Sequence, residues 1–354
     1  MYQPDYINLR NALTRQGEVK KIPLWELFAD LEVISAVIGE PISMPATKEE
    51  FRNVMRQHVD FQLATGYDYL PANVGLPLQL AAAQVTEDTS DENSKGKRVW
   101  LDEHTGRMDS WEAFEKFKWP STSDINYSFV EAASAIVPDG MKVMLRTTGI
   151  LENVQWMMGY ENMAMCLYDE PELVAALFEK LGELMVSVYE NAAEIDNVEF
   201  FAMGDDLGFK SATLFSPEVL RKYVFPLQKR CVQAAHKHGG VFILHSCGNL
   251  ESIMDDLIDD VKIDAKHSYE DVITPVEEAK KLWGDRVAIV GGLDIDLMCR
   301  STEEEVRART RHILEVCSKG GGFAMGTGNS VANYIPLKNY YAMLDETKLF
   351  NSRR

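Results

Sequence analysis

A histidine and a cysteine two residues apart are the side chains of this 354-residue chain whose types and spacing best suit chemistry. His245 and Cys247 follow the apolar run 241–244, which two glycines introduce and which is too short for a typical helix. Residues two apart in an extended chain point to the same side, as two ligands of one zinc ion would need to. The pair predicts part of a zinc site where a buried strand ends. The alternative is a hydrogen-bonded pocket histidine beside a small turn residue.

A third metal ligand must come from elsewhere, because catalytic zinc usually takes three protein ligands and leaves one position open. His267 and Glu270 follow the next predicted strand, so either one can reach the same edge of a sheet. We predict His245, Cys247 and Glu270 as the metal ligands and keep His267 as the alternative third one. Both later residues can equally be solvated loop side chains.

Other polar side chains also stand just beyond predicted strands. Asp205 and Asp206 are adjacent carboxylates, which shift each other's pKa when they share a cleft, so we predict catalytic acid or base roles for them. Metal binding, substrate binding and capping of the next turn stay open for either one. Arg146 can hold a substrate carboxylate through two hydrogen bonds, or pair internally with one of the aspartates. The predicted substrate-binding residues are Asn73, Arg146, Asn329 and Tyr334.

The elements that must position these side chains are short apolar runs that alternate with helical segments, which is typical of an α/β fold with a parallel sheet. A count of about eight runs favours a (β/α)8 TIM barrel over an open sheet, and no GxGxxG motif or P-loop follows the first run. We predict a single barrel domain over residues 1–354. The runs cover residues 22–26, 67–73, 142–147, 198–205, 241–245, 261–265, 287–292 and 322–326.

One segment interrupts this alternation. Residues 82–108 are charged and rich in turn-forming residues in the middle, and strand-like at both ends. We interpret them as a β-hairpin insertion between the second and third barrel strands, lying over the mouth of the barrel.

The composition argues against some classes of partner. With 55 acidic against 36 basic residues, the net charge is -19, which disfavours nucleic acid or an anionic membrane surface as the main partner. The first residues lack the basic start and apolar core of a signal peptide, and no apolar stretch is long enough to span a bilayer. We therefore expect a cytoplasmic protein. The five scattered cysteines do not suggest a disulfide framework.

Three motifs together resemble the uroporphyrinogen decarboxylase superfamily. They are the run Phe242 to Leu250 (F-I-L-H-S-C-G-N-L), the run Gly284 to Asp294 (G-D-R-V-A-I-V-G-G-L-D) and residues 326–336 (G-T-G-N-S-V-A-N-Y-I-P). The segment 216–230 fits the same pattern. The resemblance covers roughly the C-terminal half of the chain, and it implies the (β/α)8 barrel that the alternation of elements also predicts.

Within that superfamily, His245 and Cys247 resemble the His-x-Cys of corrinoid-dependent methyltransferases of the methylcobalamin:coenzyme M type. The resemblance implies that the pair binds zinc, and that Asn329 stands at about the position where those relatives have a third, cysteine ligand. It also implies a zinc-dependent transfer of a methyl group from a methylated corrinoid, carried by a partner protein, to a thiol or tetrahydrofolate. Asp205 or Asp206 would then accept or orient the acceptor's proton.

Two alternatives stay open. The first is a uroporphyrinogen decarboxylase-like enzyme that acts on a tetrapyrrole, although the arginine-rich motif that those decarboxylases carry near the N-terminus is absent here. The second is a non-catalytic corrinoid-binding subunit that kept the fold and lost a metal ligand. We allow for a homodimer in each case.

Overall fold

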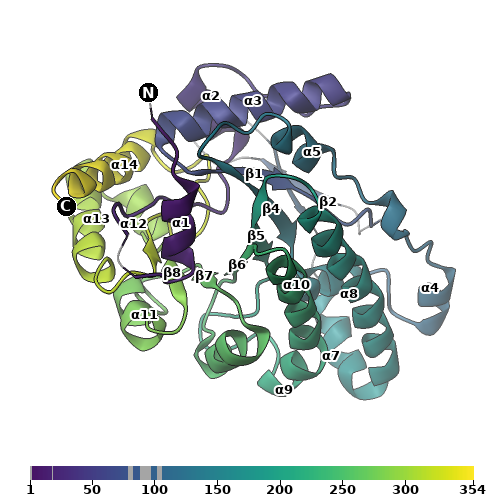
Figure 1. Cartoon of the computed structure of the whole chain (residues 1–354). Coiled ribbons are helices and arrows are strands. Elements are labelled where there is room, and N and C mark those ends of the chain that lie inside the picture. Colours follow the sequence, from purple (N-terminus) through teal and green to yellow (C-terminus); the bar gives the residue numbers. More distant parts are fainter. Residues whose placement is uncertain (1, 18, 79–82, 88–96, 102–105) are drawn as a thin grey trace.

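Seven strands form one parallel sheet whose order follows the chain (Figure 1). This computed structural model describes every residue except 1, 18, 79–82, 88–96 and 102–105. Each strand of the sheet pairs in parallel with the next, so all carboxyl ends meet at one edge, where α/β proteins place their ligands. The strands are β1 (Tyr69–Asn73), β4 (Lys142–Thr148), β5 (Val198–Gly204), β6 (Val241–His245), β7 (Ala265–His267), β8 (Ala288–Val290) and β9 (Phe323–Ala324).

Helices lie around this sheet (Figure 1), and none among the described residues is long and apolar enough to cross a membrane. The helices before β5 are α1 (Tyr6–Leu13), α2 (Leu31–Ile38), α3 (Lys48–Thr65), α4 (Trp111–Lys116), α5 (Ser128–Ser134), α6 (Ile150–Met158), α7 (Tyr160–Asp169) and α8 (Pro171–Ala193). Those after it are α9 (Pro217–Val219), α10 (Phe225–Lys237), α11 (Val276–Trp283), α12 (Ile295–Arg300), α13 (Glu303–Cys317) and α14 (Leu337–Ser352). Single 3-10 or π turns are η1 (Thr122–Asp124), η2 (Leu220–Val224), η3 (Glu251–Ile253) and η4 (Asp256–Val261).

Local sequence signals explain where several helices begin and end. α13 starts with a capping box, in which the Thr302 side chain accepts from the Glu305 backbone N–H and the Glu305 carboxylate accepts from the Thr302 backbone N–H. Thr47 and Glu50 start α3 in the same way, and Gly66 ends α3 at φ 97°. Each device satisfies backbone groups that a helix end leaves without partners.

The central strand of the site is buried from end to end. Residues Val241 to Leu244 of β6 have no exposed surface, and His245 at its end is 6% exposed. A parallel strand that is covered on both faces needs such a continuous apolar run, because no side of it meets water. His245 is therefore the last residue of a buried strand, and its ring is surrounded by packed side chains.

The structure confirms an α/β fold with a curled parallel sheet, but the eighth expected strand does not form a ladder. In the segment 22–26, Leu24 makes an isolated parallel bridge to Met325, just beyond β9. On the other side of this segment, the Tyr69 hydroxyl accepts from the Glu26 N–H at 2.7 Å and donates to the Glu26 carbonyl at 2.6 Å. A side chain thus takes the place that backbone pairing would occupy, and closure into a complete barrel stays a prediction.

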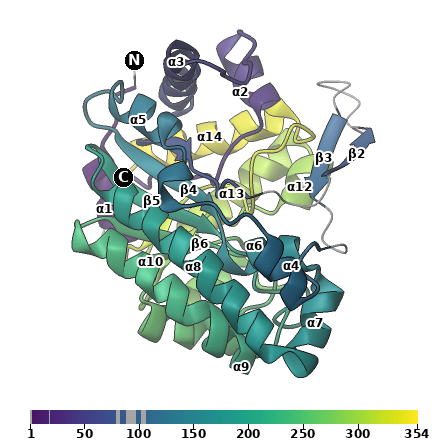
Figure 2. The same cartoon turned by 90° about the vertical axis from the view of Figure 1, so that its right-hand side faces the viewer.

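The expected hairpin falls partly outside the described residues. β2 (Ala83–Glu87) and β3 (Lys97–Leu101) pair antiparallel, and Figure 2 shows them apart from the large sheet. The residues between the two strands, 88–96, are not described. The placement of an 82–108 insertion over the mouth of a barrel is therefore not tested by the structure.

Candidate metal centre

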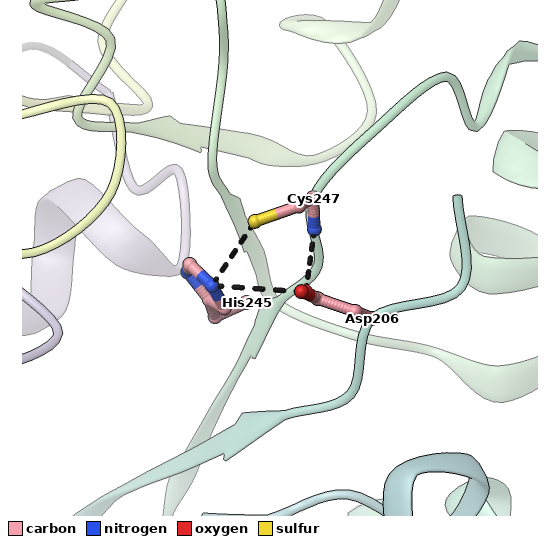
Figure 3. Close-up of side chains that lie close together, drawn as sticks. All are labelled: Asp206, His245 and Cys247. Atoms are coloured by element: carbon pink, nitrogen blue, oxygen red, sulfur yellow. Dashed lines mark hydrogen bonds and ion pairs between the residues drawn. The ribbon is translucent and has the colours of Figure 1, made fainter. Parts of the chain in front are cut away.

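Two neighbouring strand ends bring an oxygen, a nitrogen and a sulfur donor together (Figure 3). Asp206 follows β5, while His245 ends β6 and Cys247 lies two residues beyond it. His245 Nε2 lies 3.6 Å from Cys247 Sγ and 3.8 Å from Asp206 Oδ1. The three donor atoms all lie within 4.8 Å of one another, and no other such group of three was found among the described residues. This spacing fits one shared cation.

The turns that carry these donors are fixed against each other. The Cys247 backbone N–H donates to Asp206 Oδ1 at 2.8 Å, and the Leu207 N–H donates to Ser246 Oγ at 3.0 Å. Gly248 adopts a φ of 84°, and a Cβ atom there would lie 2.3 Å from the carbonyl carbon of Gly208. The close approach of two glycine backbones lets the sulfur-bearing turn rest directly on the carboxylate-bearing turn.

The His245 ring is in the neutral form that can bind a metal, and its Nε2 faces Cys247 and Asp206. Burial lowers the pKa of His245 to about 3, so the ring is neutral at physiological pH. Asp206 and Cys247 both approach Nε2, whereas the orienting carboxylate and the nucleophile of a catalytic triad contact opposite nitrogens of the histidine. The geometry therefore fits a shared metal better than a cysteine nucleophile with a histidine base.

The third residue of the group, Cys247, is a buried thiol whose ionisation a nearby cation would favour. Burial raises the pKa of its thiol above the ordinary value, and a divalent cation beside the sulfur would favour the thiolate. The Asn329 amide donates to the sulfur at 3.3 Å. Ser268 Oγ lies 3.6 Å from the sulfur and gives its proton to the Gly328 carbonyl at 2.7 Å. One carboxylate, one imidazole and one thiolate are a donor set that suits zinc.

The structure separates the two adjacent aspartates that we predicted as catalytic. Asp206 faces the cavity with a side chain 39% exposed, whereas Asp205 has no exposed surface. The Asp205 carboxylate accepts from three backbone N–H groups at the start of α6, residues 150–152, and from Gln228 Nε2 at 2.8 Å. Burial raises the pKa of Asp205 to about 6. Asp205 therefore caps the start of α6, whereas Asp206 lies close to His245 and Cys247.

The two candidates for a third ligand both lie outside the group of donors. His267 places Nδ1 2.8 Å from His245 Nδ1, on the side of that ring facing away from Cys247 and Asp206. Glu270 lines two neighbouring hollows and does not belong to the three-donor group. Asp206, on the turn after β5, is the third member of this group of donors, and Glu270 as a metal ligand stays a prediction.

The donors open into a cavity of about 390 Å³ that also contains three of the four predicted substrate-binding residues. Arg146 and Asn73 lie at paired positions of β4 and β1, and Arg146 Nε donates to Asn73 Oδ1 at 2.6 Å. The guanidinium lies 4.3 Å from the ring centre of Phe28. Burial lowers the pKa of Arg146 to about 10, which leaves it cationic at neutral pH. Asn329 lines the same cavity, and Tyr334 lines an adjoining, more open groove.

Two residues near the donors were not singled out from the sequence. Ser268 has a φ of 104°, which is strained for a residue with a side chain, and this conformation brings its hydroxyl beside Cys247. Lys266 is 2% exposed and donates through Nζ to the Ser268 carbonyl; burial lowers its pKa to about 8. Lys266 stands between the predicted run 261–265 and His267, and that position was the available signal.

Comparison with known proteins agrees with the resemblance to the uroporphyrinogen decarboxylase superfamily. The chain is 27% identical over 172 residues to the methylcobamide:CoM methyltransferase MtaA of Methanosarcina barkeri, which covers 48% of each protein. It is also 27% identical over 204 residues to the uroporphyrinogen decarboxylase of Anaeromyxobacter dehalogenans, covering 54% of this chain and 52% of that one. The chain thus spans about half the length of the curated relatives it matches.

A solved structure shares the fold over nearly the whole length. A methyltransferase from Methanosarcina mazei superimposes with a TM-score of 0.69 at 15% identity, covering 97% of this chain and 98% of that chain. The family described as uroporphyrinogen decarboxylase (URO-D) matches residues 102–350, which include the three candidate metal donors Asp206, His245 and Cys247. The chain belongs to the uroporphyrinogen decarboxylase family.

Proposed function

We propose that this chain is a zinc-dependent methyltransferase that moves a methyl group from a methylated corrinoid, carried by a partner protein, to a thiol or tetrahydrofolate. The observation that carries this proposal is the group formed by Asp206, His245 and Cys247 at the carboxyl edge of the sheet. Support comes from a relative, the Methanosarcina barkeri protein, which is named for methyl transfer between a methylcobamide and coenzyme M.

The three donors would hold the metal, and the surrounding residues would prepare them for it. When bound, zinc would act as a Lewis acid that lowers the pKa of an acceptor thiol. His245 presents a neutral ring with Nε2 toward Cys247 and Asp206. Asn329 donates to the Cys247 sulfur, which moderates the charge that the thiolate presents.

The same cavity would bind the acceptor. Among the described residues that line this cavity, Arg146 is the one arginine or lysine, so its guanidinium would attract an acidic group of the acceptor. Asn73 accepts a hydrogen bond from Arg146 and fixes the direction of the guanidinium. In the transfer, the acceptor sulfur or nitrogen forms the new bond to the methyl carbon, and the electron pair of the broken bond stays on the corrinoid. The acceptor's proton leaves to Asp206 or to water in the cavity. Tyr334, in the adjoining groove, would contact the larger donor.

The wider architecture belongs to the same proposal. Residues 22–26 would complete an eight-stranded barrel, with residues 1–354 as one domain and the β2–β3 pair near its mouth. The open carboxyl edge would then face the corrinoid protein.

The test is methyl transfer from free methylcobalamin, used in place of the partner protein, by the zinc-loaded chain. We expect loss of the methylcobalamin spectrum with a thiol or with tetrahydrofolate, and about 100-fold slower loss for Cys247→Ser. Loss of carboxyl groups from uroporphyrinogen, with no methyl transfer to any acceptor, would instead make the chain a decarboxylase. Binding of cobalamin without turnover would make it a non-catalytic corrinoid-binding subunit.

A further inference from the structure

His245 and His267 meet through the ring nitrogens that face away from the metal donors. The two residues are paired across β6 and β7, and their Nδ1 atoms lie 2.8 Å apart. A contact of this length between two nitrogens is a hydrogen bond, so one nitrogen carries the proton and the other accepts it. His267 has no exposed surface, and its ring centre lies 4.7 Å from that of Trp25 in an edge-on contact.

The second nitrogen of His267 decides which way this hydrogen bond runs. His267 Nε2 lies 3.0 Å from the Thr327 carbonyl oxygen, which can only accept. Nε2 of the neutral ring therefore carries the proton, and Nδ1 of the same ring has a lone pair. His245 Nδ1 must then donate to His267, which leaves the lone pair of His245 on Nε2, where Asp206 and Cys247 converge.

The acceptor carbonyl is itself held in place. The Thr327 backbone N–H donates to Glu26 Oε1 at 2.8 Å, and its hydroxyl donates to the other oxygen of the same carboxylate. Gly291 leaves the room that this arrangement needs. A Cβ atom at Gly291 would lie 2.3 Å from the Thr327 carbonyl oxygen and 2.7 Å from His267 Nε2.

We propose that His267 is a positioning residue that sets the tautomer of His245, so that Nε2 of His245 is ready to bind a metal, with Thr327 and Glu26 holding His267 in turn. The inference rests on the proposed metal site. It differs from the common arrangement in which a carboxylate holds a metal-bound histidine, because the chain of hydrogen bonds here passes through a second, neutral ring to a backbone carbonyl. The ligand ring thus stays neutral, and Asp206 with Cys247 supplies the two negative charges that balance a divalent cation.

Two variants of His267 test the proposal. His267→Phe keeps a ring against Trp25 but removes the acceptor, so we expect Co²⁺ and Zn²⁺ to bind about 10-fold to 100-fold more weakly. His267→Asn places an amide oxygen near the position of Nδ1 and should recover part of that affinity. His58→Phe is the control, since it removes a partly buried histidine whose Nδ1 contacts the Val54 carbonyl and which lies outside the group of donors. It should leave metal affinity within about 2-fold of wild type.

Nitrogen NMR on the metal-free protein gives a reading that needs neither metal nor activity. We expect the proton of His245 on Nδ1 and the proton of His267 on Nε2. A His245 proton on Nε2, or a folded His267→Phe variant that binds metal as tightly as wild type, would overturn the proposal. Failure of the proposed function would look different, because the expected tautomers would be found in a wild-type chain that binds no metal.

Discussion

β6 and β7 are neighbours in the sheet and both end in a histidine at paired positions, yet the two rings do different work. His245 turns one nitrogen toward a sulfur and a carboxylate, whereas both nitrogens of His267 are engaged by His245 and by a backbone carbonyl. A histidine at a strand end thus becomes a ligand or a support according to what its second nitrogen contacts. That partner comes from another strand end and cannot be read from the residue's own surroundings in the sequence.

The largest effect on metal affinity is expected for variants of the proposed ligands themselves. His245→Gln and Cys247→Ser should each weaken Zn²⁺ binding more than about 100-fold, because they remove a donor atom rather than its support. Competition with a chromophoric chelator measures the affinity. Cys299→Ser is the matched control, since Cys299 is likewise partly exposed but lies outside the group of donors. Equal losses in Cys299→Ser and Cys247→Ser would contradict the assignment of the sulfur donor.

The adjacent aspartates repeat the division between support and ligand. Asp205→Ala leaves three backbone N–H groups and Gln228 without their buried acceptor, so we expect a loss of about 3 kcal/mol in the free energy of unfolding. Asp206→Ala should change that free energy by less than about 1 kcal/mol and should weaken metal binding. Chemical denaturation and metal titration of both variants separate the two roles. A stable Asp205→Ala protein with weak metal binding would reverse the assignment.

Glu26, which holds Thr327 behind His267, predicts that the stability of the protein depends on pH. Burial raises the pKa of Glu26 from 4.5 to about 8, against the effect of its hydrogen bonds from Thr327. A group whose pKa is raised by folding contributes stability that is complete below its unfolded pKa and is lost as the pH rises through the folded pKa. Between pH 5 and pH 9, wild type should therefore lose about 2 kcal/mol or more relative to Glu26→Gln.

Denaturation curves of wild type and Glu26→Gln at several pH values measure this difference directly. The glutamine keeps the shape of the side chain and can still pair with Thr327. If the two proteins change in parallel across the whole range, Glu26 does not titrate between its unfolded pKa and about pH 8.

The smallest effect is expected at Asn329. Its amide donates to the Cys247 sulfur at 3.3 Å, and Asn329→Ala removes that donor while leaving all three metal donors. We expect Zn²⁺ binding to weaken by less than about 10-fold, since a single hydrogen bond contributes roughly 0.5 to 1.5 kcal/mol and sulfur is a weak acceptor. A loss as large as that of Cys247→Ser would show that Asn329 acts as a ligand rather than as a neighbour of one.

Several parts of this arrangement could be predicted from the sequence. The apolar run 241–244 ending in His245 is recognisable as a buried strand because it is short, continuous and bounded by glycine, and the alternation of such runs with helical segments predicts the parallel sheet. The family also follows from local motifs, because His245, Cys247 and their neighbours stand close together in the chain. These are features that depend on spacing along the sequence alone.

The remaining parts depend on contacts between distant segments. Nothing in the pair Asp205 and Asp206 shows which carboxylate meets the start of α6, because that depends on how the turn after β5 bends. Glu270 is a reasonable candidate for a ligand by its position after a strand, but it does not belong to the three-donor group. The segment 22–26 reads as a strand, yet the hydroxyl of Tyr69 stands where a backbone ladder would pair.

X-ray absorption at the zinc edge of the zinc-loaded chain tests the central claim most directly, because it counts the atoms around the metal by type. We predict one zinc per chain with one sulfur neighbour at about 2.3 Å, from Cys247, and nitrogen or oxygen neighbours at about 2.0 to 2.2 Å. The sulfur signal should vanish in Cys247→Ser. A chain that binds no zinc, or whose zinc has no sulfur neighbour, would contradict the account.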